Sequence, residues 1–316
     1  MKKFIAILNL TLLTVAGVFA QANYAATDAY VKQLGSMDSL NLAQVAKKAI
    51  AVSTDKEQQA RAIFYWIANN IAIDPKATKS NDQRKSLPED VMKLRRATPL
   101  GFAKLFQEMA SIANIRCLVV DGFVKNSLDD VSNPADEINH SWNVVQLGQS
   151  PDSWYVVDAA KASGSLDKKM ALFTKTFTSE YFFADKTLFH IDHLADNDAW
   201  QLGGVKSKKE FYTLPVIYNS AYKYGLKKPT PVTGYIKTKT KNKVSWVLPM
   251  DKAGEVKEVS LLIGEGRKMQ KPEPMNFSAG GNSINFSYQF KKDDTYPVKV
   301  LVDGKVVLEY MVEATE

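Results

Sequence analysis

The spacing of the apolar residues changes near residue 229 of this 316-residue chain. Before that point, apolar residues recur at intervals of three and four over several segments, which is the spacing of an α-helix with one buried face. After it they alternate with polar residues, as in a β-strand with one buried face. Lys228-Pro229-Thr230-Pro231 lies at the change and is typical of a linker. We therefore predict two domains, residues 21–228 and 229–316, each large enough to bury a core.

In the first part, predicted helices precede predicted strands. We expect helices over residues 41–52, 56–71, 88–96 and 98–114, and strands over residues 116–125, 141–147 and 154–159. Residues 76–86 are polar and are expected to form a loop. Thr98 is a favoured N-cap, and Pro99 suits the first helical position, where its missing N–H costs nothing. Helices followed by antiparallel strands predict an α+β fold.

The second part is predicted to be entirely β. Residues 283–290 alternate strictly, and Asp303-Gly304 separates two further alternating runs as a tight primed hairpin turn does. Four lysines, at 237, 239, 241 and 243, alternate along another segment, which is typical of an edge strand protected from unwanted pairing. We predict a β-sandwich of immunoglobulin-like size, although the chain lacks the Cys…Trp…Cys signature.

The beginning of the chain has the pattern of an export signal. Lys2 and Lys3 precede a mostly apolar run from Phe4 to Val18, and small residues up to Ala20 suit cleavage. The run contains polar residues and is short for a span of about 20 residues, so we expect no retained membrane span. A secreted or periplasmic protein, cleaved near Ala20 to leave residues 21–316, is the expectation.

Charge and cysteine content exclude several classes of function. The chain has 41 basic and 34 acidic residues, and they are interspersed rather than clustered. Nucleic-acid binding requires a concentrated basic stripe and is not expected, whereas loose attraction to an anionic envelope surface is compatible with the charge. Cys117 is the sole cysteine, so no disulfide can form within the chain and packing must supply its stability.

Several blocks of sequence resemble one known family. Ala97-Thr98-Pro99-Leu100-Gly101-Phe102-Ala103-Lys104-Leu105-Phe106 resembles the start of the catalytic helix in transglutaminase-like domains of the kyphoscoliosis-peptidase kind. Asn139-His140-Ser141-Trp142-Asn143 and Trp154-Tyr155-Val156-Val157-Asp158 resemble the blocks that carry the histidine and aspartate of that family. The resemblance covers roughly residues 55–230 and implies a papain-like transglutaminase core with helices packed on an antiparallel sheet.

The resemblance also implies that the nucleophile is missing. The Cys-His-Asp triad of the family corresponds here to Pro99, His140 and Asp158, and proline carries no nucleophile. An exported pseudoenzyme that binds protein or peptide, or organises an assembly at the cell envelope, is the implied function. Thr98, Trp142 and Trp154 are the candidate binding residues, beside the triad remnants His140 and Asp158. No cofactor is expected.

Other interpretations of the same residues stay open. The hydroxyl of Thr98 lies next to the vacant position but is expected to cap a helix, and Cys117 lies in an apolar strand, where burial raises the pKa of a thiol. An acyl transferase with an unconventional nucleophile is therefore the first alternative, and an adhesion module formed by residues 229–316 is the second. His140 and Asp158 could equally be a structural pair or line a binding cleft.

Two further histidines flank an aspartate. If the segment containing His190, Asp192 and His193 is a strand, residues 190 and 192 lie on one face and residue 193 on the other. That arrangement suits no common three-ligand site, and the matching family segment is not a metal site. We therefore predict no metal centre.

Overall fold

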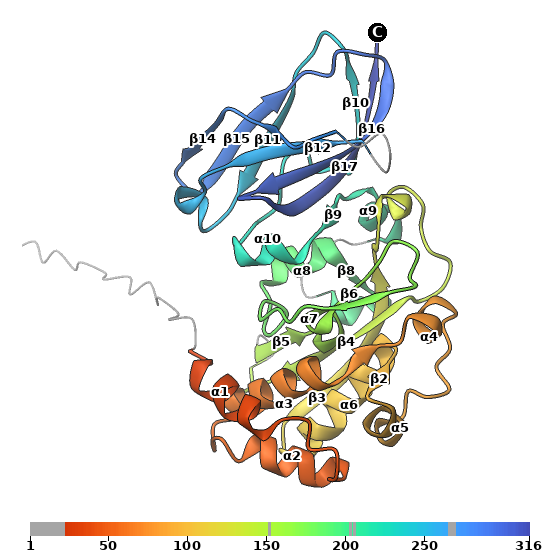
Figure 1. Cartoon of the computed structure of the whole chain (residues 1–316), viewed down its shortest axis with the longest axis vertical. Coiled ribbons are helices and arrows are strands. Elements are labelled where there is room, and N and C mark those ends of the chain that lie inside the picture. The colour runs from red at the N-terminus through yellow and green to blue at the C-terminus, as the bar shows by residue number, and fades with distance from the viewer. Residues whose placement is uncertain (1–22, 151–152, 202–203, 205–206, 265–269) are drawn as a thin grey trace, which may run out of the picture.

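A computed structural model describes residues 23–150, 153–201, 204, 207–264 and 270–316. Figure 1 shows a mixed α+β core in the N-terminal half and a β-rich C-terminal region. The expected export segment, residues 1–20, lies outside the described residues. Within the described part of the chain, every helix is too short or too polar to cross a bilayer.

Among the described residues, the α-helices lie between Ala25 and Lys223. They are α1 (Ala25–Leu34), α2 (Leu42–Ile50), α3 (Lys56–Asn70), α4 (Pro75–Lys79), α5 (Pro88–Leu94), α6 (Pro99–Ile112), α7 (Ala159–Ser163), α8 (Lys186–Asp192), α9 (Lys208–Thr213) and α10 (Asn219–Lys223). Helices α2, α3, α5 and α6 confirm the four helices predicted from the spacing of apolar residues. Short 3-10 turns occur at Leu128–Asp130, Asp198–Trp200 and Ala253–Glu255.

The prediction of a loop over residues 76–86 is wrong at its beginning, where α4 forms. Asp74 caps this helix, because its Oδ1 accepts a hydrogen bond from the backbone N–H of Ala77 at 3.0 Å. Pro75 occupies the first helical position, which it favours. The cap and the proline thus start a helical turn in a segment with no apolar stripe.

Helix α6 is the central helix of the N-terminal half and begins as predicted. Thr98 is its N-cap, and Thr98 Oγ1 accepts a hydrogen bond from the backbone N–H of Gly101 at 3.4 Å. Its apolar side is almost completely buried, as at Phe102, Leu105 and Phe106. The helix packs against strands β3 and β4 and so fixes its N-terminus relative to the sheet.

That sheet contains four antiparallel strands in the order β5-β4-β3-β8. Their bounds are β3 (Arg116–Val124), β4 (His140–Gln146), β5 (Trp154–Val157) and β8 (His193–Ala195). The predicted hairpin of β4 and β5 is confirmed, with Asn143 opposite Val157. Gly122 in β3 lies opposite both His140 in β4 and Ala195 in β8. This register brings the first residues of β4 and β8 to the same end of the sheet.

Two small sheets complete the N-terminal half. One pairs β1 (Ala72–Ile73) with β2 (Arg96–Ala97) in parallel, and the other pairs β6 (Gly164–Leu166) with β7 (Phe173–Lys175). The first of them connects the segment before α4 to the residues directly before α6. It therefore helps to hold the N-terminus of α6 in place.

The C-terminal region contains two further sheets. One has the order β10-β17-β16-β12-β13 and the other β11-β15-β14. Their strands are β10 (Tyr235–Lys239), β11 (Val244–Pro249), β12 (Val259–Ile263), β13 (Glu273–Pro274), β14 (Phe277–Gly280), β15 (Ser283–Tyr288), β16 (Asp294–Val302) and β17 (Lys305–Thr315). The ring of Trp246 from β11 meets the ring of Tyr310 from β17 edge-on, with 6.3 Å between centroids. The two sheets therefore pack through a shared apolar core.

Two local predictions for this region are confirmed, the second only in part. Asp303 and Gly304 both have positive φ, 46° and 73°, as a primed turn between β16 and β17 requires. Strand β10 is an edge strand, and its Lys237 and Lys239 are exposed as predicted. The prediction is wrong for Lys241 and Lys243, because β10 ends at Lys239 and these two residues lie in the connection to β11. It pairs with β17 in parallel.

One strand joins the two parts of the chain. Strand β9 (Val216–Ile217) precedes the expected linker but pairs with β17, with Val216 opposite Glu309. Tyr218 Oη also donates a hydrogen bond to Glu309 Oε2 at 2.5 Å. The domain boundary at residue 229 stays a prediction, and the C-terminal sheet extends to residues before it.

We predict that Gly122→Ala destabilises the protein, because the register at Gly122 leaves no room for a side chain. A Cβ atom there would lie 2.1 Å from the carbonyl oxygen of Leu194 and 2.7 Å from Trp142 Cη2. Forcing β3 and β8 apart should lower the free energy of unfolding by about 1–3 kcal/mol, as overpacking usually does. Urea denaturation followed by circular dichroism measures this loss.

The matched control is Gly280→Ala in the exposed strand β14, where an added Cβ meets nothing within 4 Å. This variant should stay within about 0.5 kcal/mol of the parent. Equal stability of the two variants would show that β3 and β8 do not approach as closely as described.

Candidate functional site

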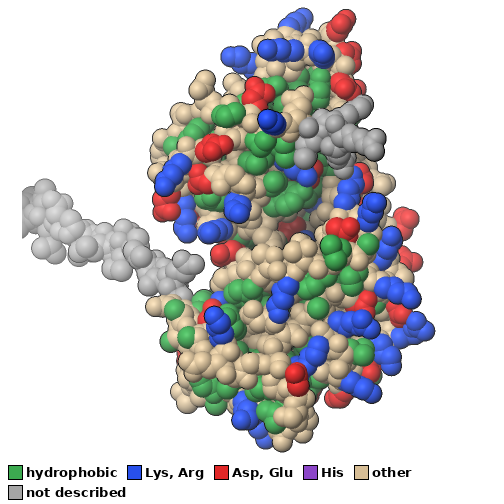
Figure 2. All heavy atoms as spheres, viewed as in Figure 1, with side chains coloured by type: hydrophobic (Ala, Val, Ile, Leu, Met, Phe, Trp, Pro, Cys, Tyr) green, Lys and Arg blue, Asp and Glu red, His purple; other side chains and the backbone are tan. Residues whose placement is uncertain are grey.

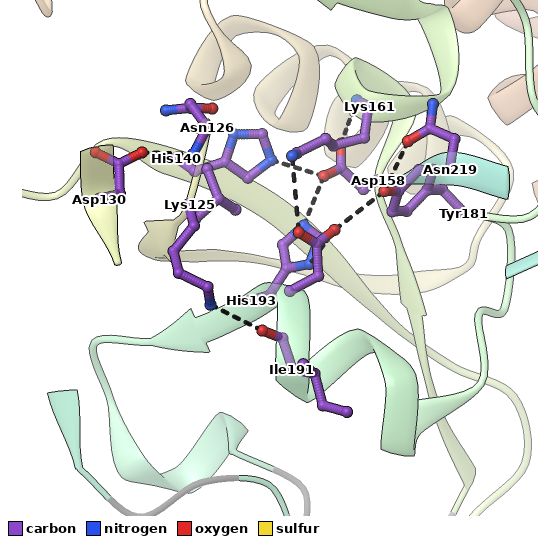
Figure 3. A network of polar contacts seen from close by, with 12 residues as sticks. Lys125, Asn126, Asp130, His140, Asp158, Lys161, Tyr181, Ile191, His193 and Asn219 are labelled. Carbon is purple, nitrogen blue, oxygen red and sulfur yellow. Dashed lines mark hydrogen bonds and ion pairs between the residues drawn. The ribbon is translucent and has the colours of Figure 1, made fainter. Parts of the chain in front are cut away.

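A buried polar cluster lies where the first residues of β4 and β8 meet the end of β5. His140 is the first residue of β4, and Asp158 directly follows β5 and is the N-cap of α7. His140 Nε2 lies 2.6 Å from Asp158 Oδ2. His193, the first residue of β8, contacts the same oxygen, with 3.0 Å from its Nε2. Figure 3 shows the two imidazoles turned toward the carboxylate between them.

Asp158 uses both of its carboxylate oxygens. Oδ1 accepts a hydrogen bond from the backbone N–H of Lys161 at 2.8 Å, which caps α7, while Oδ2 faces the two histidines. Its side chain is fully buried. Burial alone would raise the pKa of Asp158, but its electrostatic and hydrogen-bonding interactions with His140 and His193 hold that pKa well below its usual range. Asp158 is therefore ionised.

His193 is the member of the cluster that the sequence analysis missed. The segment before it is helix α8 rather than the expected strand, and the chain becomes extended at His193. The predicted strand alternation across residues 190–193 is therefore wrong. His190 is buried on α8 and does not join the cluster. The helix could have been recognised from Asp185, which caps it by accepting a hydrogen bond from the N–H of Leu188 at 3.1 Å.

Aromatic rings enclose the imidazole of His193. It stacks on Phe189 with 3.8 Å between centroids and 7° between planes, and Trp142 meets it edge-on at 5.1 Å. Burial lowers the pKa of His193, and this effect exceeds the opposing effects of Asp192 and Asp158. His193 is therefore neutral near pH 7.

Asp192 forms a second buried carboxylate beside His193. Its Oδ2 accepts hydrogen bonds from Tyr181 Oη at 3.0 Å and from Tyr222 Oη at 3.4 Å, and it lies 3.5 Å from His193 Nδ1. Lys161 Nζ lies 3.9 Å from Oδ1. Burial would raise the pKa of Asp192, but Lys161, His193 and Lys125 together with the tyrosine hydrogen bond lower it.

Lys125 is a buried cation on the other side of this network (Figure 3). Its ammonium group donates hydrogen bonds to the carbonyl oxygens of Ile191 at 3.0 Å and Phe211 at 3.2 Å. It also lies 3.5 Å from the centroid of the Phe211 ring. Burial lowers the pKa of Lys125 to about 7, although Asp192 opposes this shift.

Thr98 and Pro99 stand at the N-terminus of α6, where the sequence resemblance predicts the cysteine position of the family. Pro99 is buried in the first helical position. Thr98 is 3 % exposed, and its hydroxyl donates to Gln83 Oε1 at 2.6 Å and lies 3.1 Å from Ser86 Oγ. Because the same oxygen also caps the helix, the Thr98 hydroxyl is fully engaged in structure.

Cys117 lies on β3 opposite Val145, in the apolar surroundings predicted for it. Burial raises the pKa of its thiol to about 12. The predicted burial of this thiol is confirmed.

The two predicted binding tryptophans are also buried. Trp142 is 3 % exposed and stacks beside His140, with 6.2 Å between centroids. Trp154 is 9 % exposed and meets Trp200 edge-on at 5.0 Å. Both indoles belong to the interior around the sheet, and a binding role for Thr98, Trp142 and Trp154 stays a prediction.

An open cleft is lined by residues that are close in sequence to His140 and His193. Its volume is about 460 Å³, and its described lining includes residues 136–138, which precede β4, and residues 194–196 from the end of β8. The carboxylates of Asp136, Glu137, Asp196 and Asp198 face it, with Phe123 and Leu194 as apolar lining. Lys208 lines it as well, and its Nζ lies 4.0 Å from the centroid of the Phe123 ring. The cleft is therefore acidic, with apolar lining.

Comparison with known proteins identifies the fold around this site. The model of the transglutaminase-like superfamily matches residues 43–159, the segment that contains α6, His140 and Asp158. Residues 43–159 belong to the transglutaminase-like superfamily. The resemblance stated from the sequence blocks is thereby confirmed.

Three curated proteins are similar in sequence to this chain. Kyphoscoliosis peptidase of Mus musculus is 30 % identical over 57 % of this chain and 27 % of its own length. Its counterpart in Homo sapiens is 29 % identical over 67 % of this chain and 32 % of its own length. Cytokinesis protein 3 of Schizosaccharomyces pombe is 27 % identical over 55 % and 19 %. The chain thus spans about a third or less of the length of these relatives.

We predict that the free energy of unfolding falls as the pH drops below about 6.5, the ordinary pKa of histidine. The pKa of His193 is lowered in the folded protein. At a pH between the folded and unfolded pKa values, the unfolded chain therefore binds a proton at this side chain and the folded chain does not. Asp158 adds a further loss below about pH 4, because its depressed pKa stabilises the fold only while it is ionised. Urea denaturation at pH 7.5, 6.0 and 5.0 measures the first effect.

His193→Gln keeps a side-chain N–H that can reach Asp158 but cannot titrate. This variant should lose most of the slope between pH 7.5 and 5.0, whatever its stability at pH 7.5. An unchanged slope would show that His193 is not the group responsible.

Proposed function

We propose that this transglutaminase-like protein binds a polypeptide and does not catalyse acyl transfer. One observation carries the proposal: His140 and Asp158 are assembled at 2.6 Å, while the helix that should present the nucleophile begins with Pro99. The imidazole and carboxylate of such a site orient and deprotonate a thiol, and no thiol is present at that helix.

The described residues offer poor replacements for the nucleophile. Pro99 has no reactive side-chain atom and removes one backbone N–H from the region where an oxyanion would be stabilised. The Thr98 hydroxyl caps α6 and donates to Gln83. With a pKa of about 12, Cys117 would be ionised in roughly one molecule in a hundred thousand at pH 7. These properties favour recognition over turnover.

The acidic cleft supports a cationic polypeptide as the ligand. Asp136, Glu137, Asp196 and Asp198 are exposed around apolar lining, which suits lysine or arginine side chains with their aliphatic stems. Figure 2 shows basic and acidic side chains interspersed over one face of the molecule. The excess of carboxylates in the cleft contrasts with the mixed charges of that face.

The finer architecture belongs to the same proposal. We propose a papain-like arrangement of α6 against its sheet for the N-terminal half and an immunoglobulin-like sandwich for residues 229–316. The export expected from residues 1–20 would place the binding activity in the periplasm or outside the cell, where an envelope-associated protein is the natural partner.

We expect Pro99→Cys in a Cys117→Ser background to create an unusually acidic thiol. A thiol at a helix N-terminus near an imidazole is stabilised as thiolate by the helix dipole and the imidazolium. Alkylation by iodoacetamide at pH 6 should be at least about tenfold faster than that of an ordinary thiol of pKa about 8.5. Adding His140→Ala should lower the rate towards that of an ordinary thiol, because only the helix dipole then remains. An unreactive thiol in the Pro99→Cys variant would contradict the proposed equivalence of positions.

The unsubstituted protein provides the direct test against catalysis. It should show no incorporation of a fluorescent amine into a glutamine-containing peptide and no hydrolysis of casein. Turnover that disappears in Thr98→Ala or in Cys117→Ala would establish the alternative of an unconventional nucleophile and overturn the proposal.

We predict that a fluorescent peptide of alternating lysine and glycine binds at the cleft. The double substitution Asp196→Lys with Asp198→Lys should weaken binding at least about tenfold in low salt, because it replaces attraction by repulsion. Fluorescence polarisation measures the dissociation constant. The control Asp293→Lys changes an exposed carboxylate of the C-terminal region and should leave affinity unchanged. Equal loss in both variants would point to non-specific attraction and contradict a site in the cleft.

A further inference from the structure

Three potential ligand atoms converge inside the buried cluster. His140 Nε2, His193 Nε2 and Asp158 Oδ2 all lie within 4.8 Å of one another. They come from the beginnings of two strands and from the N-cap of a helix, so three separate elements fix their positions. Both imidazoles present the same nitrogen, Nε2, to one carboxylate oxygen. The three atoms therefore converge on one point, and each could be a ligand of a single ion.

His193 carries a second, independent feature that points to a ligand. Its Nδ1 is buried and has no hydrogen-bond partner among the described residues, although Asp192 Oδ2 lies 3.5 Å away. If Nε2 holds the proton and donates it to Asp158, the lone pair of Nδ1 faces the carboxylate of Asp192. Two electron-rich atoms then oppose each other in a buried site, which is unfavourable.

A metal ion on Nε2 would remove this conflict. The imidazole proton would then reside on Nδ1 and point toward Asp192, and a carboxylate hydrogen-bonded to the outer nitrogen is the usual support of a metal-bound histidine. Asp192 is itself positioned by hydrogen bonds from Tyr181 Oη and Tyr222 Oη. Asp192 is thus already held in the position from which it would accept a hydrogen bond from a metal-bound His193.

We propose that His140, His193 and Asp158 bind a divalent transition-metal ion such as Zn²⁺. Two imidazole nitrogens with one carboxylate oxygen suit zinc and its neighbours in the first transition series, whereas Ca²⁺ and Mg²⁺ prefer oxygen ligands. Ligand atoms at about 2.0–2.1 Å from a tetrahedral ion lie about 3.3 Å apart, so the present contacts of 2.6 and 3.0 Å would widen by about 0.7 and 0.3 Å on binding. Peptide binding at the acidic cleft and this metal site are independent of each other.

The test uses the full chain without any histidine tag, freed of metal with a chelator. Co²⁺ titration should produce the visible absorption of a nitrogen- and oxygen-coordinated ion at a stoichiometry of one per chain, and Zn²⁺ should displace it. His193→Gln and His140→Gln should each weaken binding at least about a hundredfold, since each removes one of three ligands. Asp192→Asn should weaken it by about 10–100-fold, as loss of an outer-shell partner does. Circular dichroism verifies that each variant is folded.

The chain offers a matched control, because it has only three histidines. His190→Gln changes the remaining buried imidazole, which lies outside the cluster, and should leave Co²⁺ affinity within about twofold of the parent. Absence of Co²⁺ and Zn²⁺ binding, or binding that survives His193→Gln, would overturn the proposal and leave the cluster a purely hydrogen-bonded one. A loss in His190→Gln equal to that in His193→Gln would also overturn it.

Discussion

The carboxylate of Asp158 is fully buried, and several elements of the N-terminal half contribute hydrogen-bond donors to it. An isolated buried charge would cost several kcal/mol, so it must be matched by donors from the surrounding elements. The N–H of Lys161 supplies one donor from α7, and His140 and His193 supply the others from β4 and β8. Three elements that are distant in the chain are thereby tied to one oxygen pair. Removing a histidine would leave the charge undercompensated.

The same constraint explains which parts of the site could be predicted from the sequence. His140 begins β4 and Asp158 directly follows β5, and these two strands form a hairpin. Local alternation together with the family resemblance was therefore sufficient to pair them. The predicted helix start at Thr98 depended on local cap chemistry and was also correct. A helix could thus be predicted wherever the spacing of the apolar residues and the capping residue indicated the same start.

His193 and the second carboxylate were missed for a physical reason. The segment from Lys186 to Asp192 is short, with apolar residues only at 188, 189 and 191, and so short a pattern fits a strand as well as a buried helix. Its cap, Asp185, was the only local sign of the helix. With this segment interpreted as a strand, residues 190 and 192 were placed on one face and His193 on the other. That arrangement does not apply to a helix. Contacts between β8 and β3, which are set by long-range pairing, determine where His193 points.

The role of Asp158 in the fold also changes how the His140–Asp158 pair should be interpreted. A histidine hydrogen-bonded to an aspartate is usually taken as a sign of past or present catalysis, yet here the carboxylate caps α7 and contacts two buried imidazoles irrespective of any nucleophile. Pro99, for its part, stabilises the first turn of α6. Each residue thus has a structural reason to occupy its position. The presence of the pair is therefore no argument for activity, and binding at the cleft or at a metal ion must be judged on its own measurements.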